Sequence, residues 1–316
     1  MIHAVNIQGL VKRYGDVTAL AGLDLRVPVG SIFGFLGPNG AGKTTTLRIL
    51  VGLLRATQGR AHVLSRDAWT DRVDVCAHVG YLSGEVHFHD WMTGADFLRF
   101  SDQARGGGAK EEIARLQRQF DLELHRRIRD YSRGMKQKLG LIQAMMHQPE
   151  LLILDEPTTA LDPLIQHVLY EELRAAAAAG RTILFSSHTL SEVELLCDRV
   201  AIIRSGRLIE ESTIDALRGR ALRRVTFRLK ADHSPVENPP EGLEILSTRD
   251  GTRSATWQGP VDRLLPWLTA SGVEDLIIGP PDLEDLFARY YREDSTASDE
   301  TQGAKGTKTP VRDDDD

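Results

Sequence analysis

Short, wholly apolar runs alternate along the chain with longer segments whose apolar residues recur at helical spacing. The runs at 32–36, 151–154 and 182–185 contain almost no polar side chain and are rich in leucine, isoleucine and phenylalanine. Strands buried on both faces of a parallel sheet have this composition. Segments 45–54 and 139–145 instead place apolar residues on one helical face. The pattern predicts an α/β fold around a parallel sheet.

The pattern changes near residues 217–220, after a last apolar run at 200–203. Val225, Phe227 and Leu229 alternate with polar residues, which predicts a half-buried strand. The Asp-Gly pair at 250–251 predicts a hairpin within 243–257. We expect a loop at 235–240, a helix at 261–268, a strand at 273–278 and a helix marked by Leu283, Leu286, Phe287 and Tyr290.

These boundaries predict three parts. Residues 1–218 form the main domain and residues 219–294 form a small α+β accessory domain, in which no catalytic constellation is visible. Its favoured role is packing or support of a dimer. Residues 295–316 contain Ser, Thr, Gly, Asp and Lys with almost nothing apolar, so we expect a disordered acidic tail.

The most specific chemical signal lies between the first buried strand and the helix after it. Residues 37–44 match the phosphate-binding loop G-x-x-x-x-G-K-[ST], in which glycines let backbone N–H groups curl around a polyphosphate. Lys43 adds a charge for the outer phosphates, and Thr44 adds a hydroxyl for Mg²⁺. The predicted phosphate-binding residues are Gly37, Pro38, Asn39, Gly40, Ala41, Gly42, Lys43, Thr44 and Thr45.

A pair of carboxylates ends the apolar run at 151–154. Asp155 is placed to hold Mg²⁺ together with Thr44, either directly or through water. Glu156 is placed to polarise the attacking water. A phosphate loop followed by an apolar strand with this ending predicts hydrolysis of a nucleoside triphosphate.

Residues 131–138 indicate which class of nucleoside triphosphate hydrolase this is. Ser132 is a plausible N-cap of the helix that follows, and Gly134 leaves room for a phosphate. In this position the segment resembles the signature loop of the ATP-binding cassette (ABC) family, usually LSGGQ. Tyr131, Arg133 and Met135 depart from that form, as is common in the exporter branch.

Other motifs of the same family follow in order. Residues 159–162 resemble its D-loop, His188 ends a β-branched strand as its switch histidine does, and Tyr14 lies where the family stacks a ring on adenine. The resemblance covers about the first 218 residues. It implies an ABC-type P-loop hydrolase with a RecA-like core, an antiparallel β subdomain and an α-helical subdomain.

The resemblance also implies roles. Glu156, His188 and Lys43 would be catalytic with ATP and Mg²⁺ bound, and Ser132 and Gly134 would act on the ATP of a second cassette, expected to be an identical copy. The family's usual glutamine between the phosphate loop and the signature is absent here: Gly84 takes its place and Glu85 follows. Our hypothesis is that Glu85 or a water takes over that contact with the metal.

Composition limits the partners. The net charge of -6 argues against a general nucleic-acid binder. No apolar run approaches the ~18 residues that span a bilayer. Cys76 and Cys197 match no metal or redox spacing, so we expect both thiols to be reduced. Since the sequence also shows no signal-peptide pattern, we expect the chain at the cytoplasmic face of the membrane.

A separate transmembrane permease would therefore do the crossing. In the family, the region of 87–92 forms the groove that receives a short permease helix, although packing of Phe88 and Trp91 in the core explains these aromatic residues equally well. The predicted function is ATP-driven efflux of a drug, antibiotic or lipid-like compound.

Three other functions are weighed against this one. An importer cassette stays open, although the variant signature and the C-terminal appendage favour export. A soluble ATPase of the same superfamily usually carries either two cassettes in one chain or a long coiled coil within its cassette. This chain has one phosphate loop and one signature, and Lys43 and Ser132 are too close in sequence for a coiled coil between them. A GTPase would lack the signature and carry a guanine-reading motif.

Overall fold

The computed structural model describes residues 2–230, 239–249, 251–283 and 287. It divides into two compact units, Met1–Asp215 and Ala216–Asp316. The predicted loop at 235–240 lies mostly outside the described residues, as do most of the expected helix at 283–290 and the whole expected tail at 295–316.

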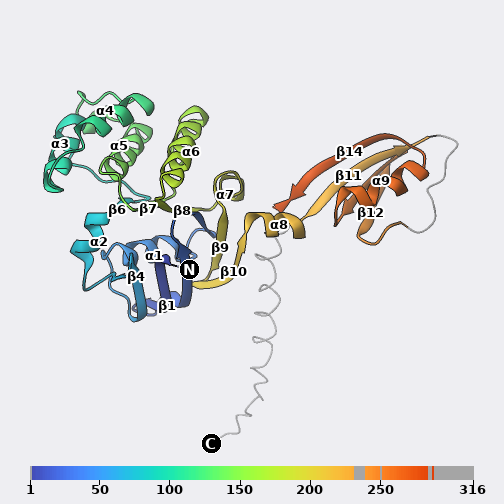
Figure 1. Ribbon diagram of the computed structural model, residues 1–316, viewed down its shortest axis with the longest axis horizontal. Coiled ribbons are helices and arrows are strands. Elements are labelled where there is room, and N and C mark those ends of the chain that lie inside the picture. Colours follow the sequence, from blue (N-terminus) through green and yellow to red (C-terminus); the bar gives the residue numbers. More distant parts are fainter. Residues whose placement is uncertain (1, 231–238, 250, 284–286, 288–316) are drawn as a thin grey trace, which may run out of the picture. The chain divides into compact units, whose positions relative to one another are not determined.

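A six-stranded sheet forms the centre of the first unit (Figure 1). Its order is β10-β9-β3-β8-β7-β6, and all neighbouring pairs are parallel except β9 with β10. The apolar runs of the sequence form β3, β7 and β8, in which every residue is buried. The strands are β3 (Ile32–Leu36), β6 (Val79–Leu82), β7 (Leu151–Asp155), β8 (Thr182–Ser187), β9 (Arg199–Arg204) and β10 (Arg207–Thr213).

A second, antiparallel sheet shares the core of the central one. Its order is β2-β1-β4-β5, and helix α1 contacts both sheets. Phe33 and Phe35 of β3 join the cluster of buried residues that includes Leu47 of α1. The predicted antiparallel β subdomain is therefore confirmed. Its elements are β1 (His3–Tyr14), β2 (Val17–Pro28), β4 (Gln58–Val63), β5 (Arg66–Asp67) and α1 (Lys43–Leu50), with α2 (Arg72–His78) following.

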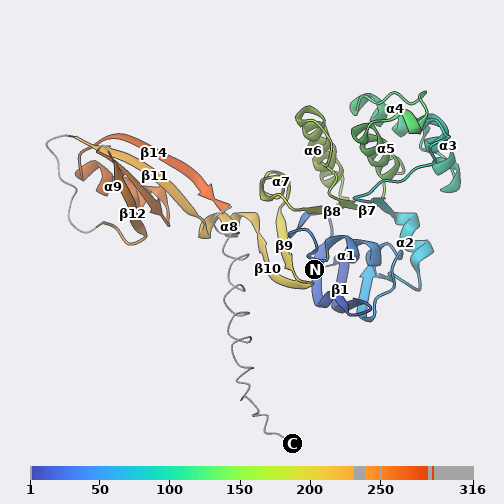
Figure 2. The same cartoon turned by 180° about the vertical axis from the view of Figure 1, so that it is seen from behind.

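The opposite face of the central sheet is covered by α6 (Pro163–Ala178) and α7 (Leu190–Leu196), as Figure 2 shows from behind. Gly34 of β3 turns to this side. A Cβ atom there would lie 2.6 Å from Cγ1 of Val193, so α7 needs a glycine to pack this closely on the strand.

Helix α1 ends earlier than the prediction of 45–54. Gly52 adopts a φ of 68°, and its N–H donates to the carbonyl oxygen of Ile49 at 3.0 Å. The N–H of Leu53 donates to the carbonyl oxygen of Arg48 at 2.9 Å. These two bonds are the Schellman ending that a glycine makes possible, so the helix stops at Leu50.

The predicted α-helical subdomain is also confirmed. Helices α3, α4 and α5 contact one another and group together in Figure 1. Segment 87–92, expected in an exposed helical region, is itself an irregular loop that leads into α3. The helices are α3 (Gly94–Ala104), α4 (Lys110–Gln119), the 3₁₀ turn at Ile128–Asp130 and α5 (Arg133–Met145).

Strand β10 extends the first unit beyond 200–203, where the sequence predicted its last strand. It pairs antiparallel with β9 at the sheet edge. Glu210 and Glu211 interrupt its sequence, so the strand has no apolar run, and all of its side chains are exposed or half-buried. Edge strands are expected to carry such charges because these discourage pairing with other chains.

The second unit is a four-stranded antiparallel sheet with one described helix of ten residues. The order is β12-β13-β11-β14, and α9 packs on the face that carries Val225, Phe227 and Trp257. Strands β12 and β13 form the hairpin that the Asp-Gly pair predicted. The elements are β11 (Leu222–Leu229), β12 (Leu243–Arg249), β13 (Thr252–Trp257), α9 (Val261–Ala270) and β14 (Val273–Asp282), with α8 (Ile214–Arg220) before them.

Within the described residues, no helix is both long enough and apolar enough to cross a membrane.

Adjacent leucines of α9 give a direct test of this second core. Leu264 is fully buried, whereas Leu265 is 44% exposed. We expect Leu264→Ala to destabilise the second unit by about 2–5 kcal/mol, because it removes buried methyl groups and leaves a cavity. Leu265→Ala is expected to change stability by less than about 0.5 kcal/mol. Denaturant unfolding followed by tryptophan fluorescence measures both, and equal losses would contradict the packing described.

Candidate functional site

The predicted phosphate loop connects β3 to α1, as a phosphate loop must. Gly40 and Gly42 have φ values of 79° and 107°, in the left-handed region. A Cβ atom on Gly42 would lie 2.7 Å from Cδ2 of Leu20 and 2.8 Å from the carbonyl oxygen of Ala19. The loop therefore requires glycine at this position for both backbone conformation and space.

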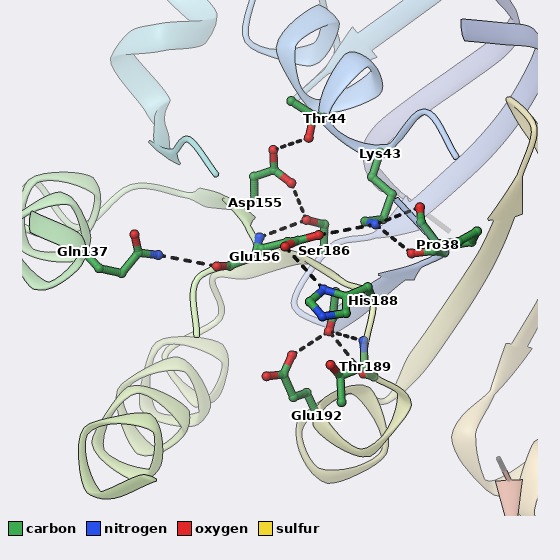
Figure 3. A network of polar contacts seen from close by, with 12 residues as sticks. Pro38, Lys43, Thr44, Gln137, Asp155, Glu156, Ser186, His188, Thr189 and Glu192 are labelled. Carbon is green, nitrogen blue, oxygen red and sulfur yellow. Dashed lines mark hydrogen bonds and ion pairs between the residues drawn. The ribbon is translucent and has the colours of Figure 1, made fainter. Parts of the chain in front are cut away.

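Lys43 lies under this loop with only 5% of its surface exposed. Its Nζ donates to the carbonyl oxygens of Gly37 at 2.7 Å and Pro38 at 3.2 Å, and lies 3.5 Å from Oε1 of Glu156 (Figure 3). The ammonium group thus lies between the loop and the carboxylate of Glu156, which was predicted from the sequence to polarise the attacking water.

Asp155 ends β7 with 1% of its surface exposed, and both of its carboxylate oxygens accept a hydrogen bond. Thr44 Oγ1 donates to Oδ2 at 2.7 Å, and Ser186 Oγ donates to Oδ1 at 2.6 Å. Gly84 lies on the Oδ2 side, where an added Cβ atom would be 3.2 Å from Oδ2. Adjacent hydroxyl and carboxylate oxygens are hard donors of the kind that Mg²⁺ prefers, so this pair fits that ion.

Glu156 is the next residue and has a φ of 47°, an uncommon left-handed conformation for a side chain of its size. Its backbone N–H donates to Ser186 Oγ at 3.1 Å and to the Ser186 carbonyl oxygen at 3.2 Å. Its Oε2 lies 3.3 Å from Nδ1 of His188. The structure therefore brings Glu156, His188 and Lys43 together.

Two groups in this network were not predicted from the sequence. Ser186 bridges Asp155 and Glu156, and the buried Gln137 donates to the carbonyl oxygens of Pro157 at 3.0 Å and Glu156 at 3.4 Å. A polar residue at the end of a buried strand, and one on the buried face of a helix, were the available signals.

The loop that carries His188 has a support of its own. Ser187 Oγ donates to Oε2 of Glu192 at 2.5 Å and accepts from the N–H of Thr189 at 2.9 Å. These bonds fix the turn from β8 into α7, so the histidine leaves the strand in a defined direction (Figure 3).

The remaining predicted residues lie on other elements. Tyr14 ends β1, is 45% exposed, and has the Nζ of Lys12 5.0 Å from its ring centroid. Ser132 is the N-cap of α5, as predicted, and accepts from the N–H of Met135 at 3.2 Å. At Gly134 an added Cβ atom would be 2.6 Å from the carbonyl oxygen of Ala160. The signature helix therefore starts against the segment at 159–162.

A buried lysine in a glycine-rich loop, a Thr-Asp pair for a divalent ion and a Glu-His pair beside them define a P-loop nucleoside triphosphatase. A family model described as ABC transporter matches residues 20–159. The daunorubicin resistance ATP-binding protein DrrA3 of Streptomyces coeruleorubidus is 39% identical over 68% of this chain and 70% of its own. The chain belongs to the ATP-binding subunits of the ABC transporters.

Other ATP-binding proteins of transporters are also similar to this chain in sequence or in structure. The bacitracin transport ATP-binding protein BcrA of Bacillus licheniformis is 36% identical over 92% of this chain and 97% of its own. A solved structure of an ATP-binding subunit of an ABC transporter matches 68% of this chain and 92% of its own, with a TM-score of 0.65 and 29% identity. The dimeric MJ0796 cassette shares the fold, with a TM-score of 0.62 and 18% identity.

A groove follows β6 beside the helical group. Its cavity of about 420 Å³ is lined by Leu53, Tyr81, Glu85, Phe88 and Phe97, among others. The ring of Phe88 packs edge-on against Phe97 with centroids 4.8 Å apart, whereas Trp91 is 73% exposed. Of the two aromatic residues noted in the sequence, Phe88 is packed and Trp91 faces solvent.

Glu85 lies in this groove as an exposed side chain, one residue beyond the glycine that faces Asp155. If it supplies the missing metal contact, as hypothesised, Glu85→Ala should lower ATP turnover several-fold and raise the Mg²⁺ concentration needed for it. Glu111→Ala, an exposed glutamate on α4, is the matched control. Steady-state ATPase assays at varied Mg²⁺ decide this, and unchanged turnover and Mg²⁺ dependence in Glu85→Ala would end the hypothesis.

Proposed function

We propose that this chain is the ATP-hydrolysing subunit of an exporter for a drug, antibiotic or lipid-like compound. The observation that carries the hydrolytic part is the Glu156 carboxylate, held 3.5 Å from Lys43 and 3.3 Å from His188 next to the Asp155–Thr44 pair. The named resistance and bacitracin transport relatives support the export part.

Binding of ATP would use the loop at 37–45. Its backbone N–H groups and the N-terminus of α1 attract the phosphates, because both present positive partial charge. Lys43 adds a full charge for the outer phosphates. Tyr14 would stack on the adenine, since its ring is exposed at the end of β1.

Thr44 and Asp155 would hold Mg²⁺, which when bound neutralises charge on the phosphates. Glu156 accepts a hydrogen bond from the attacking water and increases its nucleophilicity. His188 keeps the Glu156 carboxylate oriented through its Nδ1 contact with Oε2. Attack on the γ-phosphorus forms a new P–O bond to water and breaks the bond to the leaving oxygen of ADP.

The site is composite in this proposal. Ser132 is exposed at the N-terminus of α5, where a helix attracts anions, and would act on the ATP of a second copy together with Gly134. Two copies would enclose two ATP molecules, and their separation after hydrolysis would move the membrane partner.

The membrane partner would be a transmembrane permease, to which this chain would bind at the cytoplasmic face of the membrane. The groove lined by Leu53, Glu85 and Phe88 is the proposed docking place for one of its short helices, and the exposed Trp91 lies near it in sequence. Importers and free-standing ATPases are not favoured, since the named relatives of known role are resistance and bacitracin transport proteins.

The parts of the chain keep their assigned roles within this proposal. Residues 1–218 would be the nucleotide-binding domain, and residues 219–294 would provide packing or support for the dimer. The match to BcrA covers nearly the whole chain, which supports an accessory domain common to both proteins.

The test is a trapped dimer. Glu156→Gln keeps the size of the side chain but removes the charge that polarises water, so ATP should stay bound and hold two copies together. Size-exclusion chromatography with light scattering should give a dimer in ATP and a monomer in ADP. Adding Ser132→Arg should abolish the dimer, because the bulky side chain obstructs the composite site. A monomer of Glu156→Gln in ATP would contradict the proposal.

A further inference from the structure

One hydroxyl group joins the two carboxylate residues of the site. Ser186 is the second-to-last residue of β8 and has no exposed surface, and the register of the sheet places it directly beside Asp155. Its Oγ donates to Asp155 Oδ1 at 2.6 Å and accepts from the Glu156 N–H at 3.1 Å. A serine hydroxyl has a single proton, and an ionised carboxylate can only accept. The direction of both bonds is therefore fixed.

This bond orients the carboxylate of Asp155. The torsion that turns a carboxylate is soft, so the side chain alone does not choose where each oxygen points. With Oδ1 held by Ser186, Oδ2 is left facing Thr44, 2.7 Å away. The proton of Thr44 then points to Asp155, and the free lone pairs of its hydroxyl point elsewhere.

The same hydroxyl supports the backbone of Glu156. That residue has a φ of 47°, which is unfavourable unless neighbouring groups hold it. Its N–H is shared between Oγ and the carbonyl oxygen of Ser186. In addition, the carbonyl oxygen of Ser187 accepts from the N–H of Gly37 at 3.3 Å. The end of β8 thus connects both carboxylates to the phosphate loop.

We infer that Ser186 is a positioning residue that directs Asp155 Oδ2 and Thr44 toward Mg²⁺ and so couples metal binding to nucleotide binding. The inference rests on the proposed metal-dependent hydrolysis. Replacing Ser186 by alanine leaves Oδ1 buried without this donor, and the carboxylate turns to find another partner. Groups that orient metal ligands typically change metal affinity by about 10–100-fold when they are lost.

The experiment measures binding of the non-hydrolysable analogue AMP-PNP to the full chain, in Mg²⁺ and in EDTA. The ratio of the two dissociation constants gives the coupling between metal and nucleotide. S186A is expected to lower this ratio about tenfold, with the constant in EDTA within about twofold of wild type. S187A, the neighbouring buried serine that bonds Glu192 instead, is expected to keep the wild-type ratio.

Two further variants separate orientation from packing. S186T keeps the hydroxyl and should keep the ratio within about threefold; an S186T loss as large as that of S186A would overturn the inference. Combining S186A with D155N should lower the ratio no further than D155N alone, because the serine acts through that carboxylate. Thermal unfolding in EDTA verifies that each variant is folded. If S186A is not, a folded S186T whose ratio falls by about tenfold still overturns the inference, because it keeps the hydroxyl.

The outcomes also separate this inference from the proposed function. A wild-type chain whose AMP-PNP affinity ignores Mg²⁺ would overturn the proposed metal site, and the role of Ser186 with it. A wild-type chain that shows the coupling, with S186A unchanged, would overturn only the role of Ser186. A general loss of AMP-PNP affinity in EDTA by a folded S186A would also count against it, since that indicates a role in nucleotide binding.

Discussion

The site depends on burial of one charge. Asp155 sits at the end of β7 with almost no exposed surface, and a carboxylate in such a place is unfavourable unless its oxygens are bonded. Thr44 and Ser186 provide those bonds, and they come from two different elements: α1, the helix after β3, and the neighbouring strand β8. Because the buried carboxylate needs both hydrogen bonds, its burial fixes the positions of Thr44, at the end of the phosphate loop, and of Ser186 in β8. The order of β3, β8 and β7 in the parallel sheet therefore also brings the residues of the site together.

A second buried charge completes the arrangement. Lys43 is 5% exposed, and its partners are two loop carbonyls and the Glu156 carboxylate, which also contacts His188. One lysine therefore connects the phosphate loop to the carboxylate that is proposed to activate water. The signature residues Ser132 and Gly134 begin a different helix, α5. This helix contacts residues 156–160 at two points, where Gln137 donates to the Pro157 carbonyl oxygen and where Gly134 packs against the Ala160 carbonyl oxygen. Gln137 thus joins α5 directly to the backbone carbonyl of Glu156.

The sequence predicted the parts of the protein whose signal is local. The buried runs that form β3, β7 and β8, the phosphate loop, and the N-cap at Ser132 all follow from neighbouring residues. The prediction of α1 overshot because Gly52 was not recognised as the residue that ends the helix, and β10 was missed because its residues Glu210 and Glu211 give no apolar run. The roles of Ser186 and Gln137 depend on which strands and helices become neighbours, and no spacing along the chain contains that information. The consequences of Gly84 also needed the structure, because only there does the glycine face Asp155.

The proposed role requires a separate membrane permease that this chain powers. The experiment for this is isolation of the tagged full chain from its native membranes in mild detergent, with identification of the co-purifying proteins. We expect a polytopic permease in equal amount, two copies of each in the complex, and ATPase activity that requires Glu156. Recovery of the chain without a membrane protein, bound to ribosomes or DNA, would mean that it does not power a transporter.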